Sequence, residues 1–290
     1  MLGPKAKAYV ELAKPRVLLG VVALFTASAL ASTSLEGGRL SLAQLMAATA
    51  AAAGLVAGAN VLNNLFDRDL DALMYRTRRR PLPSRRVGEA EALALGASLT
   101  STSLVALAFI APSTLWIAAL ALTSYLVAYT AWLKRRSWLA VASATPAVAS
   151  PVLAGWLIGA GRLTTTALLY AGIAALWGLM HFWALATVFR EDYRRASVPT
   201  LPSRLGPRAS AWVMAALAIA IALLALRAAS MRHLSPAGLA STLGLNAILV
   251  ALALKLVQRP LAGRRAWRLY KFSSPYVVLL LLSATLPCFA

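Results

Sequence analysis

Within NVLNNLFDRDLDALMYRTRRRPL, residues 60–82, an apolar run of membrane-helix length gives way to acidic residues and then to arginines. Asn63, Asp67 and Asp71 are four residues apart, and a step of four turns through roughly 400° in a helix, so their side chains form one stripe. Mg²⁺ in proteins usually takes one or two carboxylates, several waters and substrate phosphate oxygens, while arginine forks match phosphate geometry. The stretch therefore predicts a Mg²⁺–diphosphate site at the end of a membrane helix. The alternative is that the acids merely balance the nearby arginines while Asn63 packs between helices.

The composition is that of a polytopic membrane protein. The chain has 290 residues, and 60% of them are hydrophobic. We expect an all-α fold with one domain over residues 1–290, in which nine transmembrane helices surround a central, lipid-accessible cavity. Each expected span is near the ~20 residues that cross about 30 Å of hydrocarbon. The spans are residues 17–34, 42–64, 91–111, 114–132, 138–158, 165–188, 210–229, 236–256 and 272–289. The single cysteine, Cys288, excludes an intramolecular disulfide and a cysteine-based zinc site.

The basic residues predict the orientation of these spans. All but four of the 29 lysines and arginines fall in the N-terminal segment and in the loops after the second, fourth, sixth and eighth spans. The positive-inside rule then places the N-terminus in the cytoplasm and the C-terminus outside, in the plasma membrane. The net charge of +20 thus reflects topology. Nucleic-acid binding is excluded because no soluble basic domain exists to carry it.

The acidic residues gather on the same side of the membrane. The chain has nine, and all but Glu36 lie on the expected cytoplasmic side. Charged groups are costly inside a bilayer, so such residues usually lie at an interface or face a polar cavity. Asp192, at the end of the sixth span, could therefore share a cavity with Asp67 and Asp71. Asp69 points off the stripe and is interpreted as a salt-bridge partner.

Two further groups of candidates end membrane spans on this side. Tyr129, Lys134 and Arg135 end the fourth span, either as a basic anchor with an aromatic belt or as a contact to diphosphate. His181 lies eleven residues before Asp192, close to three turns and about 16 Å deeper in the bilayer. It is an interhelical hydrogen-bond donor, an axial contact to a metalloporphyrin, or a proton-transfer residue.

These residues resemble the UbiA-type intramembrane prenyltransferases, most closely the branch that modifies haem. Many members carry a second D-x-x-x-D stripe, whereas this chain has Ala196 four residues after Asp192, which fits the haem branch. The resemblance covers most of the chain. It is carried by LAKPRV (12–17), NNLFDRDLDALM (63–74), Arg76-Thr77, RPLPS (80–84), Tyr129-Thr130, LKR (133–135), HFWALA (181–186), Arg190, Asp192-Tyr193 and PTLP (199–202).

The resemblance implies a Mg²⁺-dependent transfer of farnesyl from farnesyl diphosphate to a vinyl group of haem b, with water added, giving haem o. It implies metal binding by Asn63, Asp67 and Asp71, with Asp192 holding a second ion. It further implies that the leaving diphosphate is neutralised by Arg76, Arg80 and Lys134, joined by Arg135. The implied substrate contacts are Tyr129, His181, Trp183, Arg190 and Tyr193. Beyond the lipid bilayer, the implied partners are a haem A synthase and the machinery that assembles terminal oxidases.

Two other functions remain open from the sequence. One is a related prenyltransferase that acts on an aromatic acid or a lipid headgroup. The other is a transporter with a cytoplasmic cation site, which would need charged or broken helices at the bilayer midplane. The ionisable residues instead crowd one surface.

Overall fold

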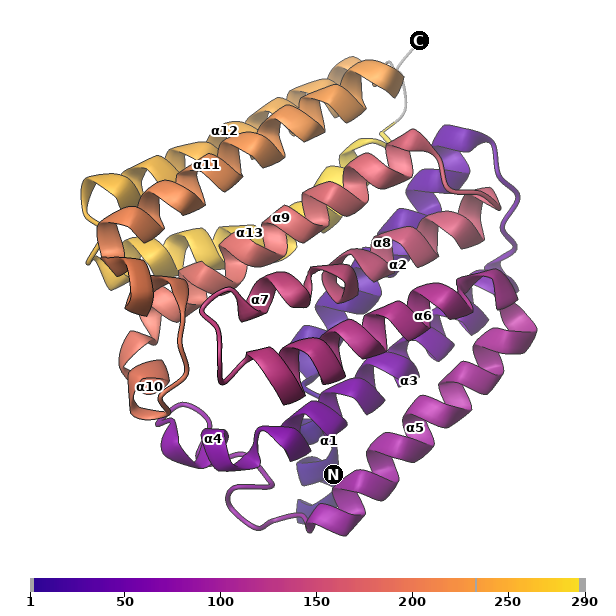
Figure 1. Cartoon of the computed structure of the whole chain (residues 1–290). Coiled ribbons are helices and arrows are strands. Elements are labelled where there is room, and N and C mark those ends of the chain that lie inside the picture. The colour runs from indigo at the N-terminus through magenta and orange to yellow at the C-terminus, as the bar shows by residue number, and fades with distance from the viewer. Residues whose placement is uncertain (1–2, 233, 287–290) are drawn as a thin grey trace.

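A computed structural model describes residues 3–232 and 234–286, and every regular element within those ranges is a helix (Figure 1). The expected all-α fold is confirmed for this part of the chain. Cys288 and His233 lie outside the described residues. The elements, in chain order, are α1 (Pro4–Leu12), α2 (Pro15–Glu36), α3 (Leu42–Phe66), α4 (Arg68–Leu73), α5 (Glu89–Ile110), η1 (Pro112–Thr114), α6 (Leu115–Leu122), η2 (Thr123–Leu133), α7 (Ala140–Ser143), α8 (Thr145–Ala160), α9 (Thr165–Val188), α10 (Arg190–Arg195), α11 (Leu201–Arg232), α12 (Pro236–Gln258) and α13 (Gly263–Ser283).

Eight helical segments of the described chain are long and apolar enough to cross a membrane. They match the first eight expected spans closely, except that α11 begins at Leu201 and bends at Gly206, which has a φ of 77°. The expected count of nine is not confirmed. The ninth helix, α13, has 21 residues, but it begins at Gly263 rather than at residue 272, and its first half carries several basic residues. It nevertheless packs against α9, α12 and α2.

Small residues allow the helices to approach closely. At Gly155 of α8, an added Cβ would collide with the carbonyl oxygen of Phe25 in α2. One turn away, the Ser28 hydroxyl of α2 donates a 2.7 Å hydrogen bond to the carbonyl of Val152. Without a hydrophobic drive between helices in lipid, such close contacts and interhelical hydrogen bonds provide the association energy. The α2–α8 pair is therefore one of the tight joints of the bundle.

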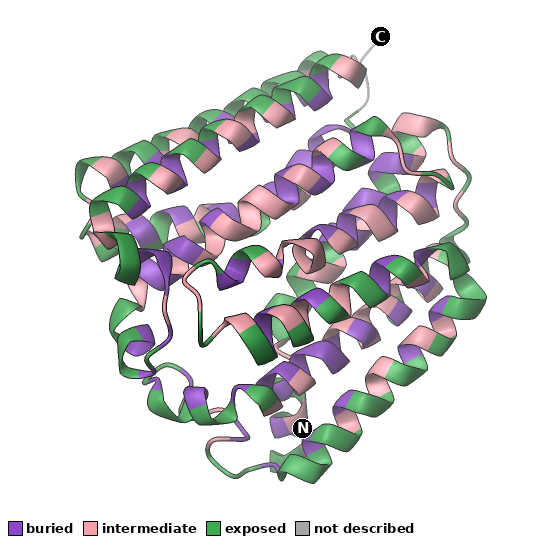
Figure 2. Ribbon diagram, in the orientation of Figure 1, coloured by how far each residue is buried: buried purple, intermediate pink, exposed green. Residues whose placement is uncertain are grey.

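The outer surface is apolar, as a lipid-facing surface should be. Buried residues line the inner faces of the helices, whereas exposed ones face outward (Figure 2). Several exposed side chains are large and hydrophobic, including Phe109 at 85%, Leu42 at 71% and Leu19 at 69% exposure. A soluble protein rarely shows so much apolar surface, so the pattern agrees with a bilayer as the surrounding solvent.

The second half of the fourth span has an unusual geometry. Thr123–Leu133 forms a π-helix, η2, that continues α6 without a break. Its i→i+5 hydrogen bonds widen each turn, so side chains four or five residues apart lie above one another. Tyr125 and Tyr129 accordingly stack, with ring centroids 6.2 Å apart. This wide turn faces the end of α3, where the acidic stripe begins.

Candidate active site

The predicted stripe survives a break in the helix that carries it. Asn63 lies in the last turn of α3, Asp67 joins α3 to α4, and Asp71 lies in α4. Across the junction the Asp67 N–H donates to the Asn63 carbonyl at 3.0 Å, and the Asp71 N–H donates to the Asp67 carbonyl at 2.7 Å. These bonds keep the four-residue repeat, so the three side chains stay on one side. All three are buried.

Three cations from three separate segments reach this stripe. Lys134 Nζ lies 2.6 Å from Asp67 Oδ2, and an Arg80 guanidinium nitrogen lies 2.7 Å from Asp71 Oδ2. Lys14 Nζ donates a short hydrogen bond to Asn63 Oδ1. Removing one partner of a buried ion pair costs about 3–5 kcal/mol, because the other charge stays buried and uncompensated. The structure therefore brings two carboxylates, an amide, two lysines and an arginine together at this end of the bundle.

Asp67 keeps one oxygen free for a ligand. Its Oδ2 accepts hydrogen bonds from Lys134 and from the Asn63 amide, whereas its buried Oδ1 has no partner among the described residues. A buried carboxylate oxygen without a partner is costly, and a cation satisfies it. The described residues contain no group of three or more His, Cys, Asp or Glu side chains suited to a metal ion. Two carboxylates and the Asn63 amide nevertheless match Mg²⁺, which completes its shell with water and phosphate oxygens.

The corner between α1 and α2 is fastened to α3. The Asn64 amide donates to the Leu12 carbonyl at 2.8 Å, and the Asn60 amide donates to the Ala13 carbonyl at 3.0 Å. The next residue, Lys14, adopts a left-handed backbone with a φ of 53°. These contacts aim the Lys14 side chain at the stripe, where desolvation lowers its pKa to about 7.

The π-helix aligns its polar side chains with α3. The Thr130 hydroxyl accepts a 2.9 Å hydrogen bond from the Asn63 amide and donates at 2.6 Å to the Tyr125 carbonyl. Four residues later, Lys134 reaches Asp67. Because the two residues are four apart, their side chains lie on one face of this helix, the face toward the end of α3. Tyr129 lies beside them, with the Lys134 ammonium 5.7 Å from its ring centroid.

Asp192 comes from the other half of the chain and contacts the loop after α4. Its two oxygens accept the backbone N–H groups of Tyr75 and Arg76, both at 3.0 Å. The Arg76 guanidinium lies 5.0 Å from the centroid of the Phe189 ring. The two acidic segments therefore meet at one end of the bundle, where α4 and α10 lie side by side (Figure 1).

Arg135 and Arg190 lie at the edge of this arrangement. Arg135 pairs with both oxygens of Asp69 at 2.7 Å, which is the salt bridge expected for Asp69. That contact lowers the pKa of Asp69. Arg190 is exposed, and its nearest acidic partner, Glu191, is 3.7 Å away.

Trp183 and Tyr193 are buried in the bundle. Trp183 belongs to the central hydrophobic core, and its indole N–H has no partner among the described residues. Tyr193 packs edge-on against Phe182, with ring centroids 5.9 Å apart, and burial raises the pKa of its hydroxyl. His181 lies between two aromatic rings of α9 and α13.

Several site residues were not recognised from the sequence. In the sequence, Lys14 is only part of a basic N-terminal segment, although Leu12–Val17 belongs to the resembling motifs. The hydrogen-bonding roles of Asn60, Asn64 and Thr130 were also missed. Asn60 and Asn64 bracket Asn63 within an apolar run, and buried amides at helical spacing were the available signal.

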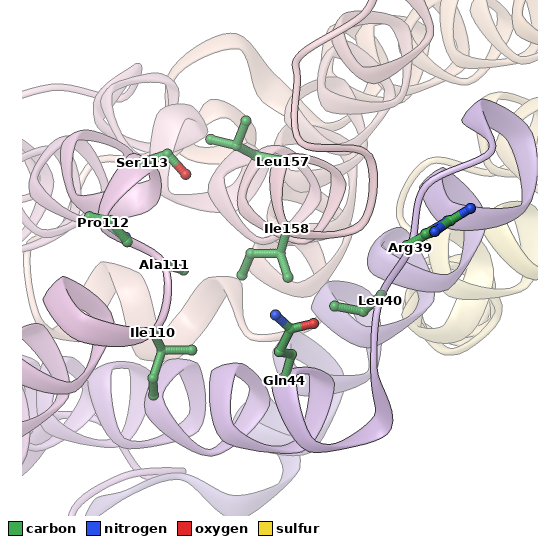
Figure 3. A pocket seen from close by; sticks show the side chains of 9 residues that line it. All are labelled: Arg39, Leu40, Gln44, Ile110, Ala111, Pro112, Ser113, Leu157 and Ile158. Carbon is green, nitrogen blue, oxygen red and sulfur yellow. The ribbon is translucent and has the colours of Figure 1, made fainter.

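A pocket of about 210 Å³ is lined by the side chains shown in Figure 3, none of which belongs to the stripe. Gln44, in the first turn of α3, and Ile158 of α8 line it together with Arg39. Asp67 is 23 residues further along the chain from Gln44, which corresponds to about 35 Å of helix. This pocket therefore belongs to the opposite end of the bundle, and the predicted central cavity stays a prediction.

The sequence is similar over almost its whole length to proteins named protoheme IX farnesyltransferase. It is 37% identical to protoheme IX farnesyltransferase of Thermosynechococcus vestitus, over 96% of this chain and 88% of that protein. It is 36% identical to protoheme IX farnesyltransferase of Pyrobaculum neutrophilum, over 95% of this chain and 98% of that one.

Solved structures share the fold. A digeranylgeranylglyceryl phosphate synthase superposes with a TM-score of 0.76 at 18% identity, covering 97% of each chain. A UbiA homologue from Archaeoglobus fulgidus bound to GPP and Mg²⁺ gives 0.69 at 16% identity, covering 96% of this chain and all of that one. The model of the UbiA prenyltransferase family matches residues 20–275. The chain thus belongs to the UbiA prenyltransferase family.

Proposed function

We propose that this protein transfers a farnesyl group from farnesyl diphosphate to a vinyl group of haem b and adds water, giving haem o and diphosphate. The C1–oxygen bond of farnesyl diphosphate breaks, and its electron pair leaves with the diphosphate. A carbon–carbon bond forms between farnesyl C1 and the terminal vinyl carbon. The cation left on the inner vinyl carbon takes up the oxygen of water, which releases a proton.

One observation carries this proposal: the buried row of Asn63, Asp67 and Asp71 is met by Lys14, Lys134 and Arg80. A diphosphate leaving group needs charge stabilisation, and this cluster places acidic and basic groups together at the membrane boundary. The choice of acceptor rests on the relatives, which bear the name protoheme IX farnesyltransferase over almost the whole chain. The A. fulgidus homologue bound to GPP and Mg²⁺ supports a prenyl diphosphate donor.

The donor set fits a divalent cation, because Asp67 Oδ1 is buried without a partner and two further oxygen-bearing side chains lie on the same stripe. Asn63, Asp67 and Asp71 would hold it. When bound, Mg²⁺ supplies Lewis-acid charge stabilisation for the diphosphate oxygens. A second ion at Asp192 stays a prediction, and this carboxylate already fixes the backbone of Tyr75 and Arg76.

The chain's own cations then act on the leaving group. Arg80 and Lys134 each contact a carboxylate of the stripe, so a diphosphate held there would lie within their reach. Arg76 is held by its backbone contact to Asp192 and rests on Phe189. Preorganised charges of this kind stabilise a departing anion without reorganisation cost during the reaction. Because farnesyl and porphyrin are both largely apolar, we place the active site in a membrane cavity that limits the access of water to the allylic cation.

We place the protein in the plasma membrane as one domain, with the stripe and the N-terminus on the cytoplasmic side. All but four of its lysines and arginines lie on that side in the proposed topology. Labelling of single cysteines, introduced as Arg79→Cys or Arg162→Cys in protein whose native Cys288 is replaced by Ser, tests this orientation in intact cells. Only the cysteine that replaces Arg162 should react with an impermeant maleimide, and the reverse pattern would contradict it.

Purified full-length protein with haem b, farnesyl diphosphate and Mg²⁺ tests the function. The expected product is haem o, identified by mass spectrometry. Parallel reactions supply an aromatic acid or a glycerol phosphate lipid as the acceptor. Prenylation of one of these, with haem b unmodified, would replace the proposal with the related prenyltransferase activity.

A further inference from the structure

His181 is clamped between two helices. It lies in α9, two turns before that helix ends at Val188. Its ring is 4.9 Å from the Trp177 ring in the same helix and 4.4 Å from the Tyr270 ring in α13, measured between centroids. The imidazole is inclined to each of these two rings by less than 30°. Both faces of the imidazole are therefore covered, and only its edge is available for other contacts.

Ser273 of α13 determines which ring nitrogen carries the proton. Its buried hydroxyl lies 2.8 Å from His181 Nδ1 and donates at 3.0 Å to the Tyr270 carbonyl, three residues earlier in the helix. A hydroxyl has one proton to donate, so toward His181 it acts as the acceptor. The network therefore assigns the neutral tautomer with the proton on Nδ1 and a lone pair on Nε2.

The Ser273 backbone secures the same arrangement. Its carbonyl accepts a 2.6 Å hydrogen bond from the Trp177 indole N–H. One residue of α13 thus fixes both Trp177 and His181 of α9. Because Ser273 bonds to both residues, it fixes the orientation of the imidazole ring as well as the position of its proton.

The remaining nitrogen is open to a ligand. No hydrogen bond joins His181 Nε2 to any residue in the described part of the chain. Buried side-chain atoms without a partner there are Asp67 Oδ1, Trp156 Nε1 and Trp183 Nε1, and His181 Nε2 is not one of them. Nε2 therefore keeps some accessible surface without a protein partner in the described part of the chain.

A row of aromatic rings connects His181 to the diphosphate side of the site. Tyr270 stacks on Trp267 at 5.2 Å, and Trp267 meets Phe189 edge-on at 6.4 Å. The Arg76 guanidinium in turn lies over the Phe189 ring, 5.0 Å from the ring centroid. The row runs along α9 and α13, so a flat apolar molecule placed against it would extend from Nε2 toward the loop that contacts Asp192.

We propose that Ser273 is a positioning residue that presents the Nε2 lone pair of His181 to the iron of the metalloporphyrin acceptor. This inference rests on the proposed function and names the acceptor side of that site. Neutral imidazole nitrogen is the commonest protein ligand of haem iron, and the partner on the other nitrogen sets its orientation and basicity. Coordination through Nε2 would hold the porphyrin beside the aromatic row, with no bond of the porphyrin changed.

The test is a titration of purified full-length protein with ferric haem b, followed by absorption and electron paramagnetic resonance spectra. The wild type should show a histidine-ligated spectrum. His181→Gly should lose that spectrum, and added imidazole should restore it. Ser273→Ala should weaken haem affinity about 10-fold, the usual effect of losing a partner of a metal-bound histidine, and should alter the spectrum.

Ser274→Ala is the matched control. The Ser274 hydroxyl donates to the same Tyr270 carbonyl at 2.9 Å, but Ser274 has no contact with His181 in the described structure. Its haem spectrum and affinity should remain those of the wild type. Equal effects at positions 273 and 274, or an unchanged spectrum in His181→Gly, would overturn the proposal.

The outcome is separable from that of the proposed function. A histidine-ligated spectrum that depends on Ser273, without formation of haem o, would retain this inference and reject farnesyl transfer. If the protein forms haem o but its haem spectrum is unchanged by His181→Gly and by Ser273→Ala, farnesyl transfer is retained and this inference is rejected. Binding of farnesyl diphosphate should be unchanged in Ser273→Ala, which reports that the variant is folded.

Discussion

Lys134 Nζ lies 2.6 Å from Asp67 Oδ2, although 67 residues separate the two in the chain. The lysine follows the π-helix η2, and the aspartate follows α3, so the pair joins the ends of two spans. Both side chains are largely buried, at 12% and 4% exposure. This contact ties the geometry of the proposed metal site to the geometry of the unusual helix.

Replacing Asp67 with Asn should nearly abolish farnesyl transfer. The substitution keeps the shape but removes the charge that faces Lys134 and the proposed cation. We expect a rate at least about 100-fold lower, comparable to the loss of one preorganised transition-state contact. Formation of haem o in membranes, measured by mass spectrometry, checks this.

Asp69→Asn is the control for that experiment. Asp69 pairs with Arg135 on the surface, where both side chains are about half exposed. A surface ion pair contributes less than about 1 kcal/mol. Activity near the wild-type level is therefore expected, and equal loss in both variants would argue against a special role for Asp67.

Removal of divalent cations should stop the reaction. Chelation with EDTA is expected to reduce transfer to background, and added Mg²⁺ should restore it. The proposed cation binds the diphosphate through the coordination positions that the two carboxylates and the amide leave open, so without it the diphosphate loses this contact. The Mg²⁺ concentration for half-maximal rate should rise about 10-fold in Asp71→Asn. Full activity after exhaustive chelation would contradict the proposed metal site.

Replacing Arg80 with Ala should reduce both stability and activity. Asp71, with a side-chain exposure of 6%, would lose its nearest cation. We expect a loss of about 3 kcal/mol, which is typical of a broken buried pair, and a lower melting temperature in detergent. The neighbouring Arg79 is exposed, so Arg79→Ala should melt like the wild type. Similar melting of both variants would show that the Arg80–Asp71 contact adds little.

Thr130 offers a test of the alignment made by the π-helix. Thr130→Val keeps the shape but removes the acceptor for Asn63 and the donor to the Tyr125 carbonyl. Asn63 would keep its bond to Asp67 but lose the acceptor for its other amide proton, at a cost of about 1–3 kcal/mol. Because that bond holds the Asn63 side chain in the stripe, transfer should fall about 5- to 100-fold. Thr130→Ser retains the hydroxyl and should keep most of the activity. If the serine variant were as impaired as the valine variant, the methyl group and not the hydrogen bonds would matter.

Matched glycine substitutions test the tight joint between α2 and α8. In Gly155→Ala the new Cβ would collide with the Phe25 carbonyl and approach Ser28 Cβ to 3.0 Å. We expect a destabilisation of about 2 kcal/mol from overpacking. In Gly172→Ala the nearest atom, Leu224 Cδ1, lies at 3.7 Å, so that variant should be at least as stable as the wild type. Thermal unfolding in detergent distinguishes the two.

Hydropathy and residue spacing predicted most of the bundle and the stripe of Asn63, Asp67 and Asp71. Spans of about 20 apolar residues are dictated by bilayer thickness, and Asn63, Asp67 and Asp71 follow helical geometry directly. The π-helix was not predictable, because its residues fit an ordinary apolar helix and only tertiary contacts reveal the wider turn. Lys14 was missed for a similar reason, since a basic N-terminal segment is already explained by topology. The first half of α13 was excluded from a span by its charges, although the helix packs against α9.

The pairing of Asp67 with Lys134 also has a consequence for synthesis, because the two residues leave the ribosome at different times. The carboxylate is synthesised 67 residues before its lysine. At about 5–20 residues per second, that gap lasts roughly 3 to 13 seconds. During this interval the membrane insertion machinery holds an acidic residue whose final neighbour does not yet exist. Nascent chains arrested before Lys134 should therefore be recognised by membrane quality control as incomplete.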